Sequence, residues 1–209
     1  TIAPVFFRNQ PLGCTATIVY QMYKESGVEI EKKIAGLLCS AIISDTLLFR
    51  SPTCTQVDKN AALELAELAG IQIEKYAGEM FAAGSNLRGK SVEEIFYQDY
   101  KRFTSEKVSF GVGQISSVNE EELEALKERL MPFIQEKQKE PGLDMLFFML
   151  TNILTDTTAL ICAGQGSEQM IAAAFHMEGI KENSGSVMLQ SVVSRKKQLI
   201  PVIMMALQN

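Results

Sequence analysis

The sequence predicts an α/β protein built in two parts, a helical first part followed by a small α/β domain with a mixed sheet flanked by helices. Two observations predict this class. Apolar residues recur at helical spacing through most of residues 13–83, whereas beyond residue 90 strand-like apolar runs alternate with amphipathic helices. The 209 residues are 46% hydrophobic and 22% charged, which is enough apolar material for real cores.

The first part is expected to contain one short strand and four helices. Residues 3–8 are strand-like, and the small polar residues 13–15 then begin the first helix, which Gly27 ends. Apolar periodicity predicts the later helices, the third of them preceded by Pro52 and Thr53. The four helices are expected over residues 16–23, 29–44, 56–69 and 73–83.

A small, polar, glycine-containing stretch follows the fourth helix and is typical of a linker. We place this linker at residues 85–90, so the chain divides into domains at 1–84 and 91–209. In the second domain we expect strands over residues 107–118, 144–150, 158–162 and 187–190. Helices are expected over residues 120–139, 168–175 and 198–207, with Asn119 as the cap of the first.

Composition excludes several classes of protein. The formal net charge of −5 disfavours a broad nucleic-acid surface, so any anion site must come from a local cluster of cations. No apolar run reaches the roughly 18 residues of a membrane span, and no signal peptide opens the chain, so we expect a cytoplasmic protein. The four cysteines are widely spaced, which predicts reduced thiols and neither a zinc site nor disulfides.

Three local features have both a functional and a structural interpretation. The stretch 164–167 (GQGS) follows a strand and precedes a helix, but it lacks the lysine of a nucleotide-binding loop, so we interpret it as a turn and cap. His176 is the only histidine, and it is more simply a structural or surface residue than a ligand. Asp45 lies among Ile42, Ile43 and Leu47, so a helix cap, an ion pair and a metal ligand all remain open, with capping ahead.

Three consecutive cations, Arg195, Lys196 and Lys197, stand between two apolar runs near the end of the chain. A solvated turn before the last helix is the simple interpretation. The other is an anion site, because clustered like charges are costly to desolvate unless a negative group meets them.

Three stretches together resemble the manganese-dependent (family II) inorganic pyrophosphatases of the DHH phosphoesterase superfamily. They are residues 13–17 (GCTAT), residues 35–55 (AGLLCSAIISDTLLFRSPTCT) and residues 193–198 (VSRKKQ). The order and separation of these stretches agree with the two-domain plan of that family, and the resemblance covers about residue 11 to the C-terminus.

The resemblance implies pyrophosphate hydrolysis by metal-activated water, with Mn²⁺ as the metal and Co²⁺ or Mg²⁺ as alternatives. By position, Asp45 matches a metal-ligating carboxylate, whereas Arg195 and Lys196 match the substrate-binding pair. Lys101 matches a further phosphate-binding lysine, and the role of Lys197 is less certain. Arg offers a planar fork to phosphate oxygens and Lys a point charge.

The same resemblance implies that the DHH motif and the remaining metal ligands of the family lie upstream of residue 1. We therefore expect residues 1–84 to be the C-terminal part of a DHH domain and residues 91–209 the substrate-binding domain, and we expect the isolated chain to be inactive. The family also implies a homodimer formed through the DHH domain. The alternatives are a short-chain exopolyphosphatase, a non-catalytic anion-binding fragment and, less favoured, a DHH exonuclease acting on nucleic acid.

Overall fold

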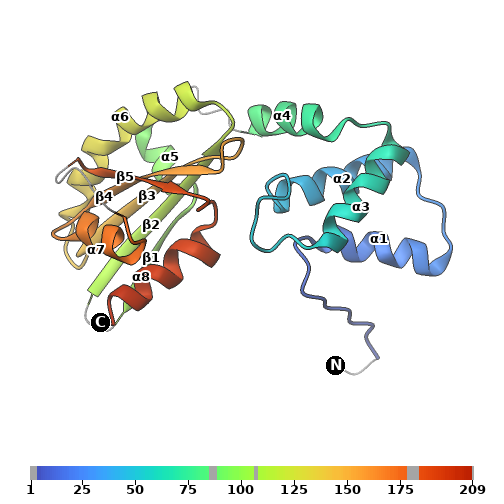
Figure 1. Cartoon of the computed structure of the whole chain (residues 1–209), viewed down its shortest axis with the longest axis horizontal. Helices are drawn as coiled ribbons and strands as arrows, with labels where there is room; N and C mark the ends of the chain where they lie inside the picture. Colours follow the sequence, from blue (N-terminus) through green and yellow to red (C-terminus); the bar gives the residue numbers. More distant parts are fainter. Residues whose placement is uncertain (1–3, 85–88, 106–107, 178–183, 209) are drawn as a thin grey trace. The chain divides into compact units, whose positions relative to one another are not determined.

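The computed structural model describes residues 4–84, 89–105, 108–177 and 184–208, and Figure 1 follows the chain through its elements. The residues form two compact units, Thr1–Phe81 and Ala82–Asn209. The expected linker at 85–90 falls partly on residues 85–88, which lie outside the described residues. None of the described helices is long and apolar enough to cross a membrane.

The first unit is helical, as the apolar periodicity predicts. Its helices are α1 (Thr15–Ser26), α2 (Lys32–Asp45), α3 (Gln56–Ala69) and the start of α4 (Ile73–Gly84). Gly27 and Gly70 end α1 and α3 in the left-handed conformation, which a residue without Cβ adopts at little cost. The small core lies between α1, α2, α3 and α4 and includes Tyr20, Cys39, Ile42 and Leu65.

The strand expected at residues 3–8 is wrong for the residues described. Residues 4–10 form no strand, and the side chains of Val5, Phe6 and Phe7 are 69%, 77% and 83% exposed. A β-branched and aromatic composition favours a strand only where a neighbouring strand accepts its hydrogen bonds. The first unit provides no such strand among its described residues.

The second unit is built around a five-stranded sheet in the order β1-β2-β3-β4-β5. The strands are β1 (Tyr100–Ser105), β2 (Val108–Ser117), β3 (Met145–Asn152), β4 (Thr157–Ala163) and β5 (Ser186–Gln190). Strands β2 and β3 pair in parallel and the other neighbours are antiparallel. The sheet is mixed, which confirms the predicted fold class.

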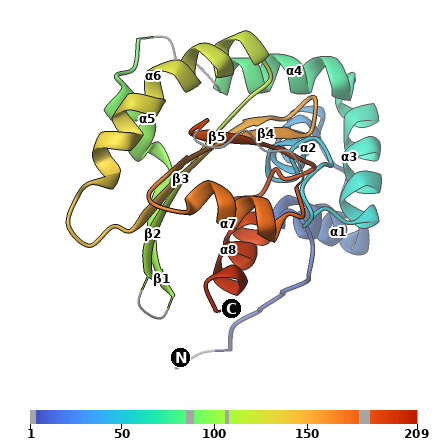
Figure 2. The same ribbon diagram turned by 60° about the vertical axis from the view of Figure 1, so that its left-hand side comes forward.

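Helices cover both faces of this sheet (Figure 2). One face packs against α5 (Val92–Gln98) and α6 (Glu120–Gln138), with Phe96, Leu130 and Phe148 in the buried layer. The other packs against α7 (Ser167–Ala174), the single π-helical turn η1 (Arg195–Leu199) and α8 (Ile200–Ala206). Helix α6 connects β2 to β3, as a crossover between parallel strands requires.

Two elements, α5 and β1, were not expected from the sequence. The sequence signal for α5 is the pair Ser91 and Glu94, a capping box in which each side chain bonds the backbone N–H of the other residue. Strand β1 places Lys101 in the sheet, opposite Val112 of β2.

Candidate functional site

The three consecutive cations form one turn, η1, that runs directly into α8. The side-chain oxygen of Ser194 accepts a hydrogen bond from the backbone N–H of Lys197 at 3.3 Å and so caps the turn. The side-chain oxygen of Gln198 accepts from the backbone N–H groups of Val193 and Ser194 at 3.0 and 2.9 Å. These bonds fix the backbone of the basic residues, in contrast to a loosely solvated turn. Single π-helical turns of this kind are frequent at functional sites.

Arg195 is buried, with its side chain 10% exposed. Its Nη1 donates to the backbone oxygens of Asp99 at 2.6 Å and Val112 at 3.3 Å, and its Nη2 forms an ion pair with the Asp99 carboxylate at 2.8 Å. The Asp99 and Val112 partners satisfy the desolvated charge, so the guanidinium is held in one orientation.

Lys101 lies on the face of the sheet that Arg195 contacts. It is the cross-strand partner of Val112, whose side chain belongs to the core layer under η1 and α8. Directly opposed residues of an antiparallel pair point to the same face. Because Arg195 also bonds the backbone of Asp99, two residues before Lys101, the structure brings these two predicted cations to one end of β1.

The side chains of Lys101, Lys196 and Lys197 are exposed, and no described residue forms an ion pair or hydrogen bond with any of the three ammonium groups. Lys196 and Lys197 stand at the N-terminal end of a continuous helical segment, where the positive end of the helix dipole disfavours cations and favours an anion. The local field at this end of the second unit therefore suits a negatively charged ligand.

Gln114 holds the backbone at the start of η1 in place, a role that nothing in the sequence indicated. Its amide donates to the backbone oxygen of Val193 at 2.9 Å, and its oxygen accepts from the backbone N–H of Arg195 at 3.3 Å. It thereby ties the basic turn to β2. No local signal could find it, because the partners are about 80 residues apart in sequence and meet only through the register of the sheet.

Asp45 is the last residue of α2, and the expectation that apolar residues enclose its carboxylate is wrong. Ile42 and Ile43 are fully buried, but they lie on the core side of the helix and Asp45 is exposed. The carboxylate lies beside the buried thiol of Cys14. Burial, together with this hydrogen-bonding contact, raises the pKa of Cys14 to about 12. An accessible carboxylate is compatible with metal ligation.

The structure places the buried carboxylate of the first unit elsewhere, at Asp58. Its two oxygens accept five hydrogen bonds, from the backbone N–H groups of Gly13, Cys14 and Thr55 and from the hydroxyls of Thr17 and Thr55. Burial alone would raise the pKa of Asp58, but these hydrogen bonds outweigh it and hold the pKa below its ordinary value. Asp58 therefore joins the N-termini of α1 and α3.

A metal centre is not complete within the residues described. No group of three His, Cys, Asp or Glu side chains that could hold a metal ion exists in residues 4–84, 89–105, 108–177 and 184–208. Asp45 could supply one oxygen ligand, whereas Mn²⁺ prefers about six in octahedral geometry. The residues described do not fit a whole metal site.

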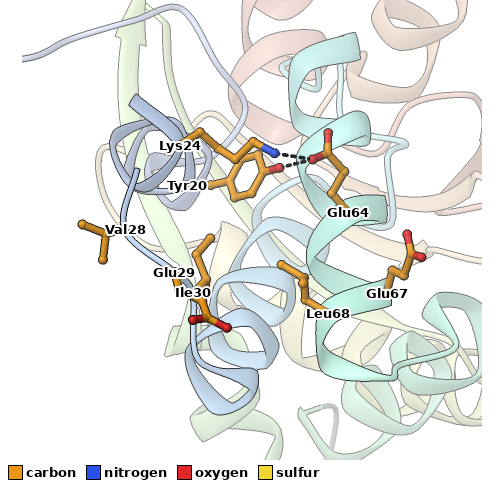
Figure 3. A pocket seen from close by; sticks show the side chains of 8 residues that line it. All are labelled: Tyr20, Lys24, Val28, Glu29, Ile30, Glu64, Glu67 and Leu68. Carbon is orange, nitrogen blue, oxygen red and sulfur yellow. Dashed lines mark hydrogen bonds and ion pairs between the residues drawn. The ribbon is translucent and has the colours of Figure 1, made fainter. Parts of the chain in front are cut away.

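Three other features are not candidate sites. Gly166 caps α7 and the Ser167 hydroxyl donates to the backbone oxygen of Gly164, as expected of a structural turn. A hollow of about 460 Å³ lies between α1 and α3 of the first unit, and Figure 3 shows Tyr20 and Lys24 both directed at the carboxylate of Glu64. These polar groups satisfy one another. His176 is exposed, in agreement with a surface role.

Comparison with known proteins identifies the family. The DHHA2 domain model matches residues 78–206. A solved structure from Methanococcus jannaschii, described as a "putative family II inorganic pyrophosphatase", aligns over all of this chain and 69% of its own, with a TM-score of 0.76 and 35% identity. The chain belongs to the family II inorganic pyrophosphatases.

Curated relatives of this family agree. A "Probable manganese-dependent inorganic pyrophosphatase" of Clostridium acetobutylicum is 43% identical over 209 residues, which are 100% of this chain and 66% of the relative. The "Cobalt-dependent inorganic pyrophosphatase" of Clostridium perfringens is 44% identical over 198 residues, which are 95% of this chain and 35% of that protein. The chain thus spans about two thirds of the length of the first and about a third of the second.

Proposed function

We propose that this chain takes part in the hydrolysis of inorganic pyrophosphate, and that its second unit binds the substrate through Lys101, Arg195 and Lys196. The observation that supports this most directly is the basic turn η1 fixed on the same sheet face as Lys101. Family membership supplies the substrate, because the relatives are named as pyrophosphatases. Pyrophosphate carries several negative charges, which oriented cations stabilise as charge develops on the leaving phosphate.

Under this proposal each cation has a distinct role. Arg195 is the buried, oriented donor, whereas Lys101 and Lys196 are exposed point charges that can adjust to a phosphate oxygen. Lys197 adds charge at the same turn and has no separate role. We assign no residue of this chain as the catalytic acid, base or nucleophile.

Asp45 is proposed as one ligand of a Mn²⁺ or Co²⁺ ion, the metals in the names of the relatives. We keep the division into a part-DHH domain at residues 1–84 and a substrate-binding domain at 91–209 as part of the proposal. A cytoplasmic location and a homodimer through the DHH part also remain proposals.

Two phosphate-release assays test the proposal. The chain alone with Mn²⁺ is expected to release negligible phosphate, because its described residues do not hold a whole metal site. A hybrid in which the chain replaces the matching two thirds of the Clostridium acetobutylicum relative should hydrolyse pyrophosphate. Its activity should fall on Arg195→Ala, with Arg129→Ala, an exposed arginine of α6, as the control.

The outcomes separate the alternatives. A folded hybrid that cleaves tripolyphosphate but not pyrophosphate would favour the exopolyphosphatase, and a folded hybrid inactive on both would favour a non-catalytic anion-binding unit. Ordinary turnover by the chain alone would show that its own residues assemble a metal site, against the proposal.

A further inference from the structure

The pairing of Arg195 with Asp99 uses only part of the guanidinium. Arginine has five N–H donors in a planar fork. The bonds to the backbone oxygens of Asp99 and Val112 use the two hydrogens of Nη1, and the Asp99 carboxylate takes one hydrogen of Nη2. In the part of the chain that the structure describes, no residue accepts from Nε or from the second hydrogen of Nη2. These two donors lie along one edge of the group.

Asp99 therefore binds the Nη1–Nη2 end of the guanidinium through two oxygens. Its backbone oxygen accepts from Nη1 at 2.6 Å, and its carboxylate accepts from Nη2 at 2.8 Å. The edge formed by Nε and Nη2 is left for another acceptor. Two parallel N–H donors along a guanidinium edge match two oxygens of a phosphate group, which is the bidentate geometry that distinguishes Arg from Lys.

The position of Asp99 in the chain links it to the second cation. Asp99 follows the end of α5 and immediately precedes β1, so Lys101 is two residues further on. The backbone oxygen of Asp99 also accepts from the backbone N–H of Gln114 at 3.2 Å. One residue thus fixes the Arg195 guanidinium and the beginning of the strand that holds Lys101.

We propose that Asp99 is a positioning residue of the phosphate site, which holds Arg195 with its Nε–Nη2 edge presented to the anion. The inference rests on the proposed function. The same carboxylate could have two other roles. It could compete with the anion, occupying Arg195 until phosphate displaces it, or it could form an ion pair that matters only for stability.

The charge and exposure of the pair distinguish these roles. The Arg195 side chain is 10% exposed, but the Asp99 side chain is 49% exposed, so water screens the carboxylate end of the ion pair. Without that carboxylate, Arg195 still bonds the backbone oxygens of Asp99 and Val112, which satisfy part of its buried charge. Loss of the carboxylate should therefore change the orientation of Arg195 more than it changes folding. If Asp99 competed with the anion, removal of its carboxylate would strengthen anion binding, whereas removal of a positioning residue would weaken it.

The test is a calorimetric titration of the 209-residue chain with pyrophosphate in the absence of metal. Asp99→Ala should weaken binding by about fivefold to tenfold, the effect of one misoriented charge-assisted contact. Asp99→Asn should stay within about twofold of the parent chain, because the amide oxygen can still accept from Nη2. Adding Asp99→Ala to Arg195→Ala should have no further effect, since the two residues act as a unit.

Glu140→Ala is the matched control. Glu140 pairs with Arg102 at 2.9 Å, and Arg102 lies next to Lys101 but bonds Tyr100 on the opposite face of the sheet. This variant also removes a carboxylate from an arginine of β1 and should leave pyrophosphate binding unchanged. The Nε–H resonance of Arg195 offers a second readout: it should shift on addition of pyrophosphate in the parent chain and in Asp99→Asn, but not in Asp99→Ala.

Each contrary result has one meaning. If Arg195→Ala weakens binding but Asp99→Ala binds as tightly as the parent chain or more tightly, the inference is wrong and the proposed phosphate site stands. If Asp99→Asn binds as weakly as Asp99→Ala although both remain folded, the orienting acceptor is not what matters, and the inference is again wrong. If Arg195→Ala has no effect, the phosphate site itself is wrong and the inference fails with it.

Discussion

The substitution Asp58→Asn is expected to destabilise the first unit strongly. Asp58 is fully buried and its two oxygens accept five hydrogen bonds. An amide removes the charge and replaces one acceptor by a donor. At the oxygen that faces Gly13 and Thr55 this donor would meet two backbone N–H groups, which cannot rotate away.

The less costly orientation places the NH₂ group at the other oxygen, where the Thr17 hydroxyl can turn to accept but the backbone N–H of Cys14 loses its partner. A hydrogen bond to a charged group contributes about 1.5–3 kcal/mol net, and an orphaned buried donor costs about 1–3 kcal/mol. Because neutral bonds replace part of the loss, we expect Asp58→Asn to lower the free energy of unfolding of this unit by about 3 kcal/mol.

Native-state hydrogen exchange measures this quantity separately for each unit. The amides of α1 and α3 should exchange faster in Asp58→Asn, and those of β3 and β4 should not change. Asp144→Asn is the control, because the Asp144 carboxylate is exposed and accepts one backbone bond, from Ser109 at 2.8 Å. Exchange of α1 and α3 in Asp58→Asn no faster than in the control chain would refute the reasoning.

Three further outcomes are expected. The pKa of Asp58 is lower in the folded state than in the unfolded state, so its stabilisation is present above about pH 4 and is lost as pH falls. The difference in unfolding free energy between the parent chain and Asp58→Asn should therefore narrow from about pH 5 to about pH 3. A constant difference in urea unfolding would contradict this. Gly164→Ala should cost about 2–3 kcal/mol in thermal unfolding, because Gly164 has φ of 107° and an added Cβ would lie 2.3 Å from the backbone oxygen of Asp144. Gly142→Ala, at φ of 74° with open space around it, should cost less, and equal costs would exclude the steric clash. Asp45→Asn in the hybrid enzyme should weaken Mn²⁺ binding, because an amide is a poorer ligand than a carboxylate; equal affinity in a Mn²⁺ titration would remove Asp45 from the metal site.

The elements with strong local signals could be predicted from the sequence. Helix α3 has the predicted bounds, because Thr55 and Asp58 form a capping box at its start and Gly70 ends it. The sequence did not predict α5 and β1, because helix α5 has 7 residues and strand β1 has 6, too few to show a clear periodicity. At residues 3–8 strand propensity was present but no pairing strand was, and propensity alone does not make a strand.

The candidate site could be predicted from the sequence only where its residues are neighbours in the chain. The basic triplet and Asp45 stood out as local anomalies, and the resemblance supplied Lys101 and the metal-ligating role of Asp45. The buried position of Arg195 could not be foreseen, because its partners Asp99 and Val112 are 96 and 83 residues away. The exposure of Asp45 was missed for a different reason, since the apolar residues around it in sequence lie on other sides of the helix.

The central claim is that η1 and the start of β1 form one phosphate site. A titration of the isotopically labelled chain with pyrophosphate, followed by NMR, tests it most directly. The claim predicts that the resonances of Lys101, Arg195, Lys196 and Lys197 shift together along one binding curve, and that those of the turn from Gly164 to Ser167 do not move. Shifts confined to that turn, or no shift at residues 195–197 at saturating pyrophosphate, would contradict the claim.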